Sequence, residues 1–394
     1  MSRENYSASP PAVSKRYVKT PRGFVRKKNA RKSYFDYSLL FLIIFMLAFG
    51  LLMLYSTSSY NAAIEYNDSA FYLKKQFKAT VLGLIVMFVV ANIDYHKYTW
   101  TGAVGYIVAI VMLFLVMSPL GKEVNGARRW IVVAGFSIQP AEVAKLALIM
   151  LLAVMINNNR QNLRKFTVSG KIFAFCLPLA ACILIITKNM SSALIVVGIA
   201  FVMLFIASPK YSHYILIGIT GVTAIVSYLL LGSGFRSERV EAWMNPEKFA
   251  SGKGYQTLQS LYAIGSGGLT GKGLGQSVQK LGYVPEAQND MVFSIICEEL
   301  GLFGGIAVIL LFLLMIWRFL VIANNAEDLY GSMIVIGVMA HISIQVILNI
   351  AVVTNVIPNT GITLPFISYG GTSILFLLIE MGLVLSVSKR IKLE

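Results

Sequence analysis

The chain has 394 residues, of which 57% are hydrophobic and only 13% are charged, and its mean hydropathy is +0.71. A compact soluble domain cannot hide that much apolar surface from water, so the composition excludes this class and predicts a polytopic membrane protein. The formal net charge of +16 suits the cytoplasmic cations of such proteins and attraction to anionic membrane lipids. Because the basic residues lack the fold signals of nucleic-acid-binding modules, no nucleic-acid partner is expected.

Residues 1–37 form a basic, polar tail. They hold ten lysines and arginines against two acidic residues, together with Pro10, Pro11 and Pro21. This composition predicts a disordered segment, and the positive-inside rule places it in the cytoplasm. The tail is too long and too polar for the charged region of a cleaved signal, so the first apolar helix is expected to remain as an anchor.

About ten apolar stretches follow the tail, each close to the roughly 20 residues that a membrane-spanning helix needs. They cover residues 38–57, 79–93, 100–119, 138–156, 172–187, 190–208, 214–231, 291–321, 333–353 and 372–387. The runs are continuous rather than alternating, which excludes an outer-membrane barrel and predicts an all-α fold. An even number of helices returns the C-terminus to the cytoplasm, where Lys389, Arg390 and Lys392 obey the positive-inside rule. Residues 38–394 are thus expected to form one transmembrane domain.

The cysteines and histidines predict neither a disulfide nor a zinc site. Cys176 and Cys182 fall on different faces of one predicted helix, and Cys297 lies in another apolar stretch. The three histidines lack the spacing of metal ligands, so they are expected to be polar residues at helix boundaries or between helices. They are His96, His213 and His341.

On this topology one long extracytoplasmic loop joins the seventh and eighth helices. It covers residues 232–290 and contains Trp243, Phe249, Tyr255 and Tyr262 among charged residues. Loops of this length without structure of their own are uncommon. We therefore expect short amphipathic helices that rest on the membrane surface.

The loop contains a glycine-rich segment at residues 265–273 (GSGGLTGKG). It does not match a P-loop, because Ser266 and Gly273 stand where that motif requires a glycine and a hydroxyl residue. Two interpretations stay open. The glycine amides, with Lys272 and Lys280, form a nest for a lipid pyrophosphate, or the glycines provide a flexible turn.

Four polar residues, Gln139, Pro140, Glu142 and Lys145, open the predicted fourth helix. Proline at the first helical position and an acidic first turn are common at helix starts, which is a purely structural explanation. Glu142 and Lys145 also lie three residues apart and can pair on one helical face. A pair buried just below the outer membrane surface indicates a polar cavity there.

The segment between the last two helices is rich in helix breakers. Residues 358–372 contain two prolines and three glycines in a largely apolar sequence. Irregular backbone at membrane depth is tolerated only against protein or a wet cavity. Either Ser368 and Tyr369 line such a cavity, or the segment is a short re-entrant turn.

The strongest functional signal is the end of the long loop, where Asp290 runs directly into an apolar helix that carries Glu298 and Glu299. Carboxylates at this depth are costly, so they are functional candidates. Asp290 is either a functional carboxylate or a simple helix cap. The two glutamates lie about 12 Å deeper along the helix. We expect one to pair within the bundle and the other to orient a neighbouring helix.

Taken together in chain order, seven motifs resemble the SEDS family (shape, elongation, division and sporulation), whose members FtsW, RodA and SpoVE are peptidoglycan glycosyltransferases. The motifs are residues 126–131 (GARRWI), 139–145 (QPAEVAK), 254–256 (GYQ), 267–273 (GGLTGKG), 285–290 (PEAQND), 298–301 (EELG) and 364–371 (LPFISYGG). Thr363 indicates the FtsW and SpoVE branch, because the RodA branch usually has proline there. Asn189 departs from the family, in which many members carry an acidic residue at that position, so no acidic role is carried to it.

The resemblance implies inverting polymerisation of lipid II, an undecaprenyl-pyrophosphate-linked disaccharide pentapeptide, at the outer face of the bacterial cytoplasmic membrane. Asp290 matches the family position of the base that takes a proton from the acceptor sugar hydroxyl. The groups expected around the pyrophosphates and the base are Arg129, Glu142, Lys145, Lys272, Lys280, Ser368 and Tyr369. Those expected to support the site are Gln139, Pro140, Glu298 and Glu299.

The resemblance also implies a class B penicillin-binding protein, a transpeptidase that crosslinks the glycan, and other division proteins as partners. No cofactor is certain. A divalent cation, Mg²⁺ or Mn²⁺, that bridges a carboxylate and the pyrophosphate is an expectation from electrostatics, and its ligands are unknown.

Three alternatives stay open at this point. A lipid II flippase would carry polar residues at middle depth in several helices, whereas those of this chain mostly lie at the predicted outer boundary, with Glu298, Glu299 and Glu380 as exceptions. A RodA-type polymerase for cell elongation and a scaffold that recruits division enzymes are the other two.

Overall fold

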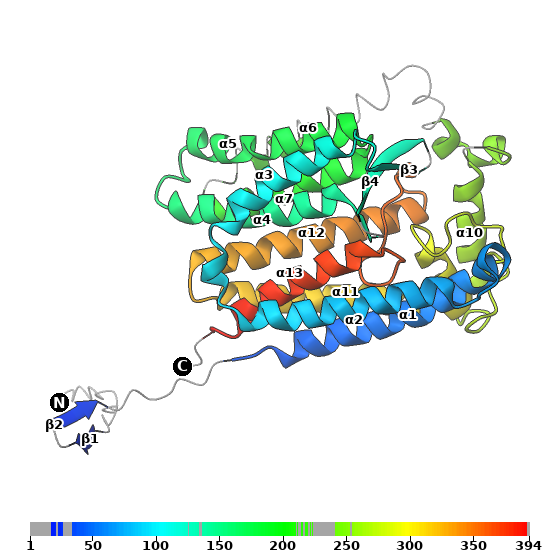
Figure 1. Cartoon of the computed structure of the whole chain (residues 1–394). Helices are drawn as coiled ribbons and strands as arrows, with labels where there is room; N and C mark the ends of the chain where they lie inside the picture. The colour runs from blue at the N-terminus through cyan, green and yellow to red at the C-terminus, as the bar shows by residue number, and fades with distance from the viewer. Residues whose placement is uncertain are drawn as a thin grey trace, which may run out of the picture.

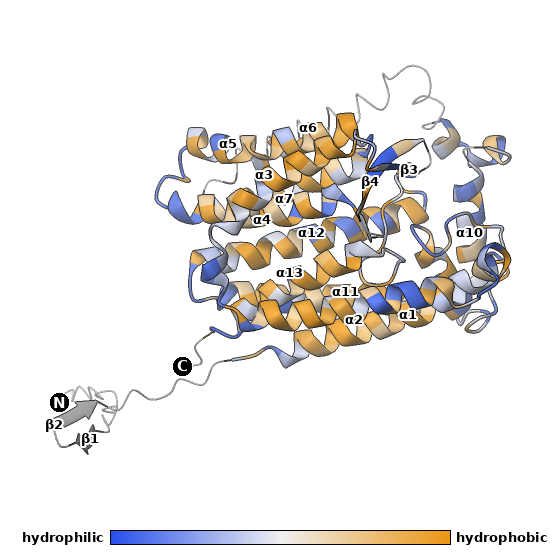
Figure 2. Ribbon diagram, viewed as in Figure 1, coloured by the Kyte–Doolittle hydropathy of each residue, from blue (hydrophilic) through white to orange (hydrophobic). Residues whose placement is uncertain are grey.

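The computed structural model describes residues 17–20, 23–26, 34–124, 126–133, 136–209, 241–252 and 254–391, with scattered residues between 211 and 223. Apolar helices run side by side as a bundle (Figure 1), and hydrophobic residues cover most of their length (Figure 2). Six helical stretches in this part of the chain are long and apolar enough to cross a membrane. They are α1 (Tyr37–Tyr66), α5 with α6 (Phe166–Ile186), α4 (Pro140–Asn158), α7 (Met190–Ala207), α11 (Val292–Asn324) and α12 (Leu329–Val353).

Three further helices occupy positions where spans are predicted. These are α2 (Phe71–Asn92), α3 (Thr101–Leu115) and α13 (Thr372–Ser388). The predicted span at residues 172–187 is shared by two helices, α5 (Phe166–Ala174) and α6 (Cys176–Ile186). The predicted span at residues 214–231 falls mostly outside the described residues. The structure thus shows a mostly helical membrane protein, and the total of ten crossings stays a prediction.

The two ends of the bundle are distinct. Near the end of α11, the guanidinium of Arg318 pairs with Asp36, just before α1, and Tyr34 N–H donates to the carbonyl of Ile391 after α13. We call this the terminal end. Asp290 precedes the first residue of α11, more than 25 residues before Arg318 on the same helix, which corresponds to about 40 Å at 1.5 Å per residue. It therefore lies at the opposite end, where α10 is drawn in Figure 1.

A small antiparallel sheet corrects the all-α prediction. Strands β3 (Gly121–Val124), β4 (Ala127–Val133) and β5 (Phe136–Ile138) lie in the order β3-β4-β5 between α3 and α4. The overlooked signal is the Asn-Gly dipeptide that ends at Gly126, which favours a tight hairpin, and Gly126 has the positive φ of 74° that such turns use. The strand β5 leads straight into α4, and its Ser137 carbonyl accepts a hydrogen bond from Thr372 at the start of α13.

A second pair of strands lies in the tail. Strand β1 (Tyr17–Thr20) pairs with β2 (Gly23–Arg26) in an antiparallel hairpin. The other residues of the segment 1–33 lie outside the described residues, so disorder there stays a prediction.

The long loop contains short helices, as predicted. It holds a 3₁₀ turn (Pro246–Phe249) and α10 (Tyr255–Gly267). The helix α10 packs against α11 and α12, and its contact with the membrane surface stays a prediction. The Ser260 hydroxyl donates to the carbonyl of Val353, and a Cβ at Gly267 would stand 2.0 Å from the carbonyl oxygen of Cys297. The part 232–240 lies outside the described residues.

The glycine-rich segment supplies backbone hydrogen bonds at a break in α11. Gly301 interrupts this helix with φ 69° and ψ −168°. The amides of Lys272 and Gly273 donate to the carbonyls of Glu298 and Glu299, while the amides after the break donate to the carbonyls of residues 268 and 269. Backbone groups that a broken helix leaves unpaired must find such partners inside an apolar bundle. This close contact of two backbones explains Gly267 and Gly271, where an added Cβ would stand 2.0 and 2.2 Å from carbonyl oxygens of α11.

We predict that Gly301→Ala destabilises the protein strongly. The backbone conformation of Gly301 is nearly restricted to glycine, which costs about 1–3 kcal/mol for other residues, and a Cβ would stand 2.3 Å from the Gly271 nitrogen. The matched control is Gly265→Ala in α10, where nothing lies within 4 Å of the added atom. Thermal unfolding of the purified variants in detergent measures the effect, and equal melting temperatures would contradict the role of the break.

Candidate active site

Asp290 lies buried in the turn before α11, with 8% of its surface exposed. The N-cap residue of α11 is Met291, and no side chain caps this helix, so Asp290 is not a simple cap. One carboxylate oxygen, Oδ1, accepts a hydrogen bond from Gln256 Nε2 of α10 at 3.4 Å. The Asp290 carbonyl accepts from Asn349 Nδ2 of α12 at 2.8 Å. Two helices thus hold this residue from different sides.

The environment of Asp290 suits a base that works near neutral pH. Burial raises its pKa to about 7, and the negative charge of Glu286 acts in the same direction. Hydrogen bonds from its own amide and from Gln256 oppose this shift in pKa. A general base works best when its pKa lies close to the working pH, because it is then both ionised and basic enough to take a proton.

The side chains of Asn359 and Gln256 form a chain of hydrogen bonds that orients the Gln256 amide toward Asp290. The Gly361 N–H donates to Asn359 Oδ1 at 3.1 Å, and Asn359 Nδ2 donates to Gln256 Oε1 at 2.8 Å. Because a backbone N–H only donates, each amide in the chain can point only one way. Gln256 therefore presents its nitrogen to Asp290. Gly361 has a φ of 68°, a conformation that favours glycine, and an added Cβ there would stand 3.8 Å from Asp290 Oδ2, an ordinary contact distance.

The Glu142–Lys145 pair forms as the sequence predicts and lies in the same region. The ammonium of Lys145 is 2.7 Å from Glu142 Oε1, and both side chains are buried. Lys145 also lies 3.5 Å from Gln345 Oε1 of α12. Gln345 is one helical turn, roughly 6 Å, from Asn349, which bonds to Asp290. The structure therefore brings together the pair on α4 and the carboxylate before α11.

The segment between α12 and α13 completes this region. Ser368 is 5% exposed, and its hydroxyl accepts from the amide of Leu364 at 2.8 Å. The amide of Tyr369 donates to the carbonyl of Gln288 at 2.9 Å, two residues before Asp290. Both residues therefore shape a turn against the Asp290 segment. Their contact with substrate stays a prediction.

Three buried acceptors near Asp290 have no hydrogen-bond partner among the described residues. They are Oδ1 of Asn349, whose nitrogen bonds the Asp290 carbonyl, Oε1 of Gln288, and Oδ1 of Asn289, which precedes Asp290 in the chain. Buried acceptors normally have a partner, so a site with three of them favours a ligand or water with hydroxyl donors. Sugar hydroxyls are donors of this kind.

The other predicted residues make local contacts. Arg129 lies on β4, and its guanidinium donates to the carbonyls of Thr187 and Lys188, at 3.3 Å each. Gln139 is the N-cap residue of α4, but its side chain makes no capping hydrogen bond, and Pro140 is the first residue of that helix. Pro140 therefore fits the structural explanation of this motif, because proline is favoured at the first helical position.

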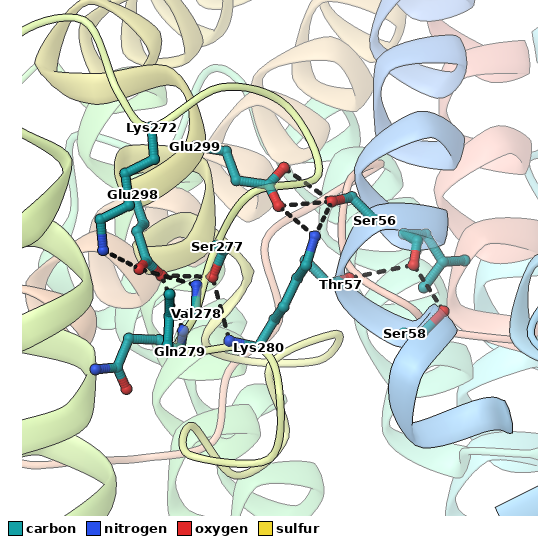
Figure 3. Close-up of polar contacts among 11 residues, drawn as sticks. Ser56, Thr57, Ser58, Lys272, Ser277, Val278, Gln279, Lys280, Glu298 and Glu299 are labelled. Atoms are coloured by element: carbon teal, nitrogen blue, oxygen red, sulfur yellow. Dashed lines mark hydrogen bonds and ion pairs between the residues drawn. The ribbon is translucent and has the colours of Figure 1, made fainter. Parts of the chain in front are cut away.

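Glu298 and Glu299 clamp the loop to the bundle (Figure 3). Glu298 Oε1 is 2.6 Å from the ammonium of Lys272, and Ser277 donates to the same carboxylate. Glu299 Oε1 is 2.7 Å from the ammonium of Lys280. Both carboxylates are completely buried. These pairs explain the two lysines without a bound anion, so contact with a pyrophosphate stays a prediction.

The clamp also reaches the first helix. The hydroxyl of Ser56 on α1 donates to both oxygens of Glu299, at 2.7 and 2.8 Å. The ammonium of Lys280 lies 2.9 Å from the same hydroxyl. Glu299 thus orients a neighbouring helix and Glu298 pairs with the loop, a division of roles close to the expected one.

A metal site receives no support from the protein ligands that the structure describes. In this part of the chain no three histidine, cysteine, aspartate or glutamate side chains come together in a geometry that could hold a cation. A divalent cation here would need oxygens from the substrate as additional ligands, as pyrophosphate provides. The cation stays a prediction.

Comparison with known proteins identifies the family. The FtsW, RodA and SpoVE model, described as a cell cycle protein, matches residues 37–393. The chain belongs to this family. The predicted resemblance is thereby confirmed, and the relatives below support the FtsW and SpoVE branch.

The similarity extends over almost the whole chain. The stage V sporulation protein E of Bacillus subtilis is 39% identical over 363 residues, which is 92% of this chain and 99% of that protein. The probable peptidoglycan glycosyltransferase FtsW of Trichlorobacter lovleyi is 35% identical, over 94% and 97% of the two chains. A chain in a structure on the coordination of polymerization and crosslinking by a peptidoglycan synthase complex superimposes with a TM-score of 0.75 at 27% identity, over 90% of this chain and 97% of that one.

Sequence reasoning missed the amide side chains of this family member's site. Gln256 and Asn359 appear only inside longer motifs, and Asn349 and Gln345 do not appear at all. Their partners on other elements lie 13 to 200 residues away in the sequence, so no local pattern reveals these contacts. One signal was available, because Gln345 and Asn349 are polar residues four apart in an otherwise apolar span.

We predict that Glu299→Gln lowers the free energy of unfolding by about 3–5 kcal/mol, because it leaves the buried Lys280 ammonium without its charge partner. The double variant Glu299→Gln with Lys280→Met removes both charges and is expected to recover much of the loss. Glu123→Gln is the control, since the Glu123–Arg128 pair is exposed and long, at 3.8 Å, and such pairs contribute little. Thermal melting in detergent compares the variants. A loss no larger than that of the control would contradict the clamp.

Proposed function

We propose that this protein is a peptidoglycan glycosyltransferase that polymerises lipid II at the outer face of the cytoplasmic membrane. Its relatives in the FtsW group carry the name of this activity. The observation that carries the proposal for this chain is Asp290, a buried carboxyl with a pKa of about 7. It is held by Gln256 at the end of the bundle away from the terminal end.

The proposed reaction needs one base. Asp290 takes the proton from the acceptor sugar hydroxyl while the hydroxyl oxygen attacks the anomeric carbon of the donor, and the configuration of that carbon inverts. The bond between this carbon and the pyrophosphate oxygen breaks, and its electron pair leaves on undecaprenyl pyrophosphate. This leaving group is stable as an anion, so it needs no proton from a second acid. Asp290 then releases the proton to water.

Cations near the base stabilise the charge that develops on the leaving pyrophosphate. Lys145 is the predicted cation that the structure links to Asp290 most directly, through Gln345 and Asn349 of α12. The other predicted cations are Arg129 on the sheet and Lys272 and Lys280 in the long loop. We propose that they contact parts of the lipid-linked sugars that lie farther from Asp290.

The predicted membrane topology supports catalysis outside the cell. If the basic tail is cytoplasmic and the chain crosses the membrane ten times, both termini lie inside and the loop 232–290 lies outside. In the described structure, the segments that lead to the two termini meet at one end, through Tyr34 and Ile391, and Asp290 lies before the other end of α11. Lipid II would therefore enter from the outer leaflet.

We propose a class B penicillin-binding protein as the partner, with a role in division or sporulation. The similar structure is described as a peptidoglycan synthase complex that coordinates polymerization and crosslinking. A polymerase and a transpeptidase act on the same glycan strand, so a complex of the two keeps the product of the first close to the second. The similarity to FtsW and to the sporulation protein favours these two processes over elongation.

One observation bears on the flippase alternative. Polar side chains do occur at middle depth, at His341 on α12 and Glu380 on α13. They are 1% exposed and bond to each other, so they are sealed inside the bundle rather than open to a passing headgroup. Catalysis therefore remains the function that the geometry supports best.

We predict that Asp290→Asn lowers the rate of lipid II polymerisation by about 10²–10⁴-fold, the usual contribution of a general base. The purified protein, with its transpeptidase partner, is incubated with fluorescent lipid II, and glycan strands are separated on gels. Glu247→Gln, an exposed carboxylate of the same loop, is the control and should keep full activity. Normal glycan from folded Asp290→Asn would remove this residue from the mechanism, whereas lipid flipping in liposomes without any polymer would favour the transporter.

We also predict that the polymerisation rate falls as the pH decreases through about 7, the raised pKa of Asp290. The base is the ionised form, so protonation removes it. Glu286→Gln should move this midpoint to lower pH, because the negative charge of Glu286 raises the pKa of Asp290. Initial rates measured across the range of about pH 5 to 8 check both points. A flat profile, or a midpoint that moves to higher pH in the variant, would contradict the assignment.

A further inference from the structure

Three polar side chains form a stripe along the apolar helix α12. His341, Gln345 and Asn349 are four residues apart, which places them on one face, and they are 1%, 6% and 0% exposed. Polar groups inside a membrane span are costly unless they find partners. The partners of this stripe therefore show what it serves.

Two members of the stripe, Asn349 and Gln345, contact the candidate active site. Asn349 Nδ2 donates to the carbonyls of Asp290 and Ile362, at 2.8 and 2.7 Å. Gln345 Nε2 donates to the carbonyl of Thr363 at 3.0 Å. The stripe thus ties the base and the segment between α12 and α13 to one helix.

The direction of the Gln345 amide follows from its neighbours. The Thr363 carbonyl can only accept a hydrogen bond, and the Lys145 ammonium can only donate one. The Gln345 nitrogen must therefore face Thr363, and its oxygen must face Lys145 at 3.5 Å. An amide turned the other way would lose both contacts.

His341, one helical turn before Gln345, supports this orientation of the Gln345 amide. Its Nε2 lies 3.0 Å from the same Gln345 oxygen, which is an acceptor, so Nε2 must carry a hydrogen. Its Nδ1 lies 2.9 and 3.0 Å from the two oxygens of Glu380 on α13. The contact with Glu380 then contains a single proton, either on Nδ1 or on the carboxyl group. In both arrangements the pair has no net charge, and Nε2 remains the donor to Gln345.

We propose that His341 and Glu380 are positioning residues of the active site: they lock Gln345 with its oxygen toward Lys145, so that Lys145 and the segment beside Asp290 keep one arrangement. This inference rests on the proposed glycosyl transfer at Asp290 and goes beyond it. It assigns a role in the reaction to two side chains that lie in the middle of the bundle. Neither of them touches the reacting atoms.

The chemistry of position 380 separates positioning from simple packing. In Glu380→Gln the new amide nitrogen donates to His341 Nδ1, which keeps the hydrogen on Nε2 and the direction of Gln345. In Glu380→Met the Nδ1 side of His341 loses its partner, and only the Gln345 oxygen still favours this tautomer. A role in packing or charge pairing predicts instead that both variants suffer, because both remove the carboxylate.

The experiment measures kcat and KM for lipid II polymerisation, with melting temperatures as the control for folding. Gln345→Met and Glu380→Met should each lower kcat by about 10–100-fold, the usual effect of a misplaced catalytic group, with little change in KM. Glu380→Gln should stay within about threefold of the wild type. Because Glu380 acts through Gln345, the double variant Gln345→Met with Glu380→Met should be no worse than Gln345→Met alone.

Additive losses in the double variant, or a Glu380→Gln that is as slow as Glu380→Met, would overturn the proposal. If Glu380→Met does not fold, the pair His341→Gln and His341→Asn replaces it. The glutamine places its nitrogen near the position of Nε2 and keeps the donor to Gln345, whereas the shorter asparagine reaches only Glu380. The proposal requires His341→Gln to be at least about tenfold faster, and equal rates would overturn it.

The outcomes distinguish this inference from the proposed function. An inactive wild type, or a fully active Asp290→Asn, would refute glycosyl transfer at Asp290 itself. An active wild type with an inactive Asp290→Asn and normal kcat in Gln345→Met would refute only the positioning role.

Discussion

The pairing of buried charges holds this bundle together, and the position of Asp290 depends on it. A charge inside an apolar bundle is tolerated only with a partner. Here the partners belong to different segments, since Glu299 of α11 binds Lys280 of the loop and Ser56 of α1. The loop is thus fixed to α11 ten residues before Asp290, and α11 itself begins two residues after it. Asp290 is held between two anchored points.

Asp290 differs from the other buried carboxylates. Glu298 and Glu299 each face a lysine at 2.6 to 2.7 Å, whereas the hydrogen bond that Asp290 accepts from another side chain comes from the neutral amide of Gln256. No cation of the described residues pairs with it, so the carboxylate is not stabilised enough to offset burial, and its pKa rises. A carboxylate paired with a lysine would be a weaker base for a sugar hydroxyl. This difference from Glu298 and Glu299 is consistent with the proton transfer proposed for Asp290.

The sequence predicted the parts of the structure that depend on composition and on ordered motifs. Continuous apolar runs located the helices, and the motif order located Asp290 and the Glu142–Lys145 pair. The sheet β3-β4-β5 was not predicted, because its strands are short, lie between two apolar helices and are signalled by a single Asn-Gly dipeptide before Ala127. The role of the glycine-rich segment could not be predicted for a different reason. Its sequence fits an anion-binding nest as well as a segment that pairs with the broken helix at Gly301.

The amide side chains around Asp290 could not be predicted for a physical reason. An amide carries no charge, so it leaves no signal in hydropathy or charge patterns. Its role is also decided by partners far away in sequence, as for Gln256 with Asn359 and Gln345 with Lys145. Only the three-dimensional arrangement shows which of the many Gln and Asn residues serve the site.

The segment between α12 and α13 shows how these amides permit irregular backbone beside the base. Five consecutive residues from 360 to 364 have a backbone polar group satisfied by a side chain. The partners are, in order, Ser191, Asn359, Asn349, Gln345 and Ser368. Because these side chains replace hydrogen bonds of a helix, the chain can bend between its two prolines with these five backbone groups paired.

This replacement also links the bend to the chemistry. Asn349 binds both the bent backbone and the Asp290 carbonyl. Asn359 binds the bent backbone and Gln256, which in turn binds Asp290. A shift of the bend would therefore move Asp290, and a shift of Asp290 would leave carbonyls of the bend without donors. Buried polar groups that are linked by hydrogen bonds in this way favour one arrangement over others. The order of the candidate site is thus tied to the need to pair the backbone of the bend inside an apolar bundle.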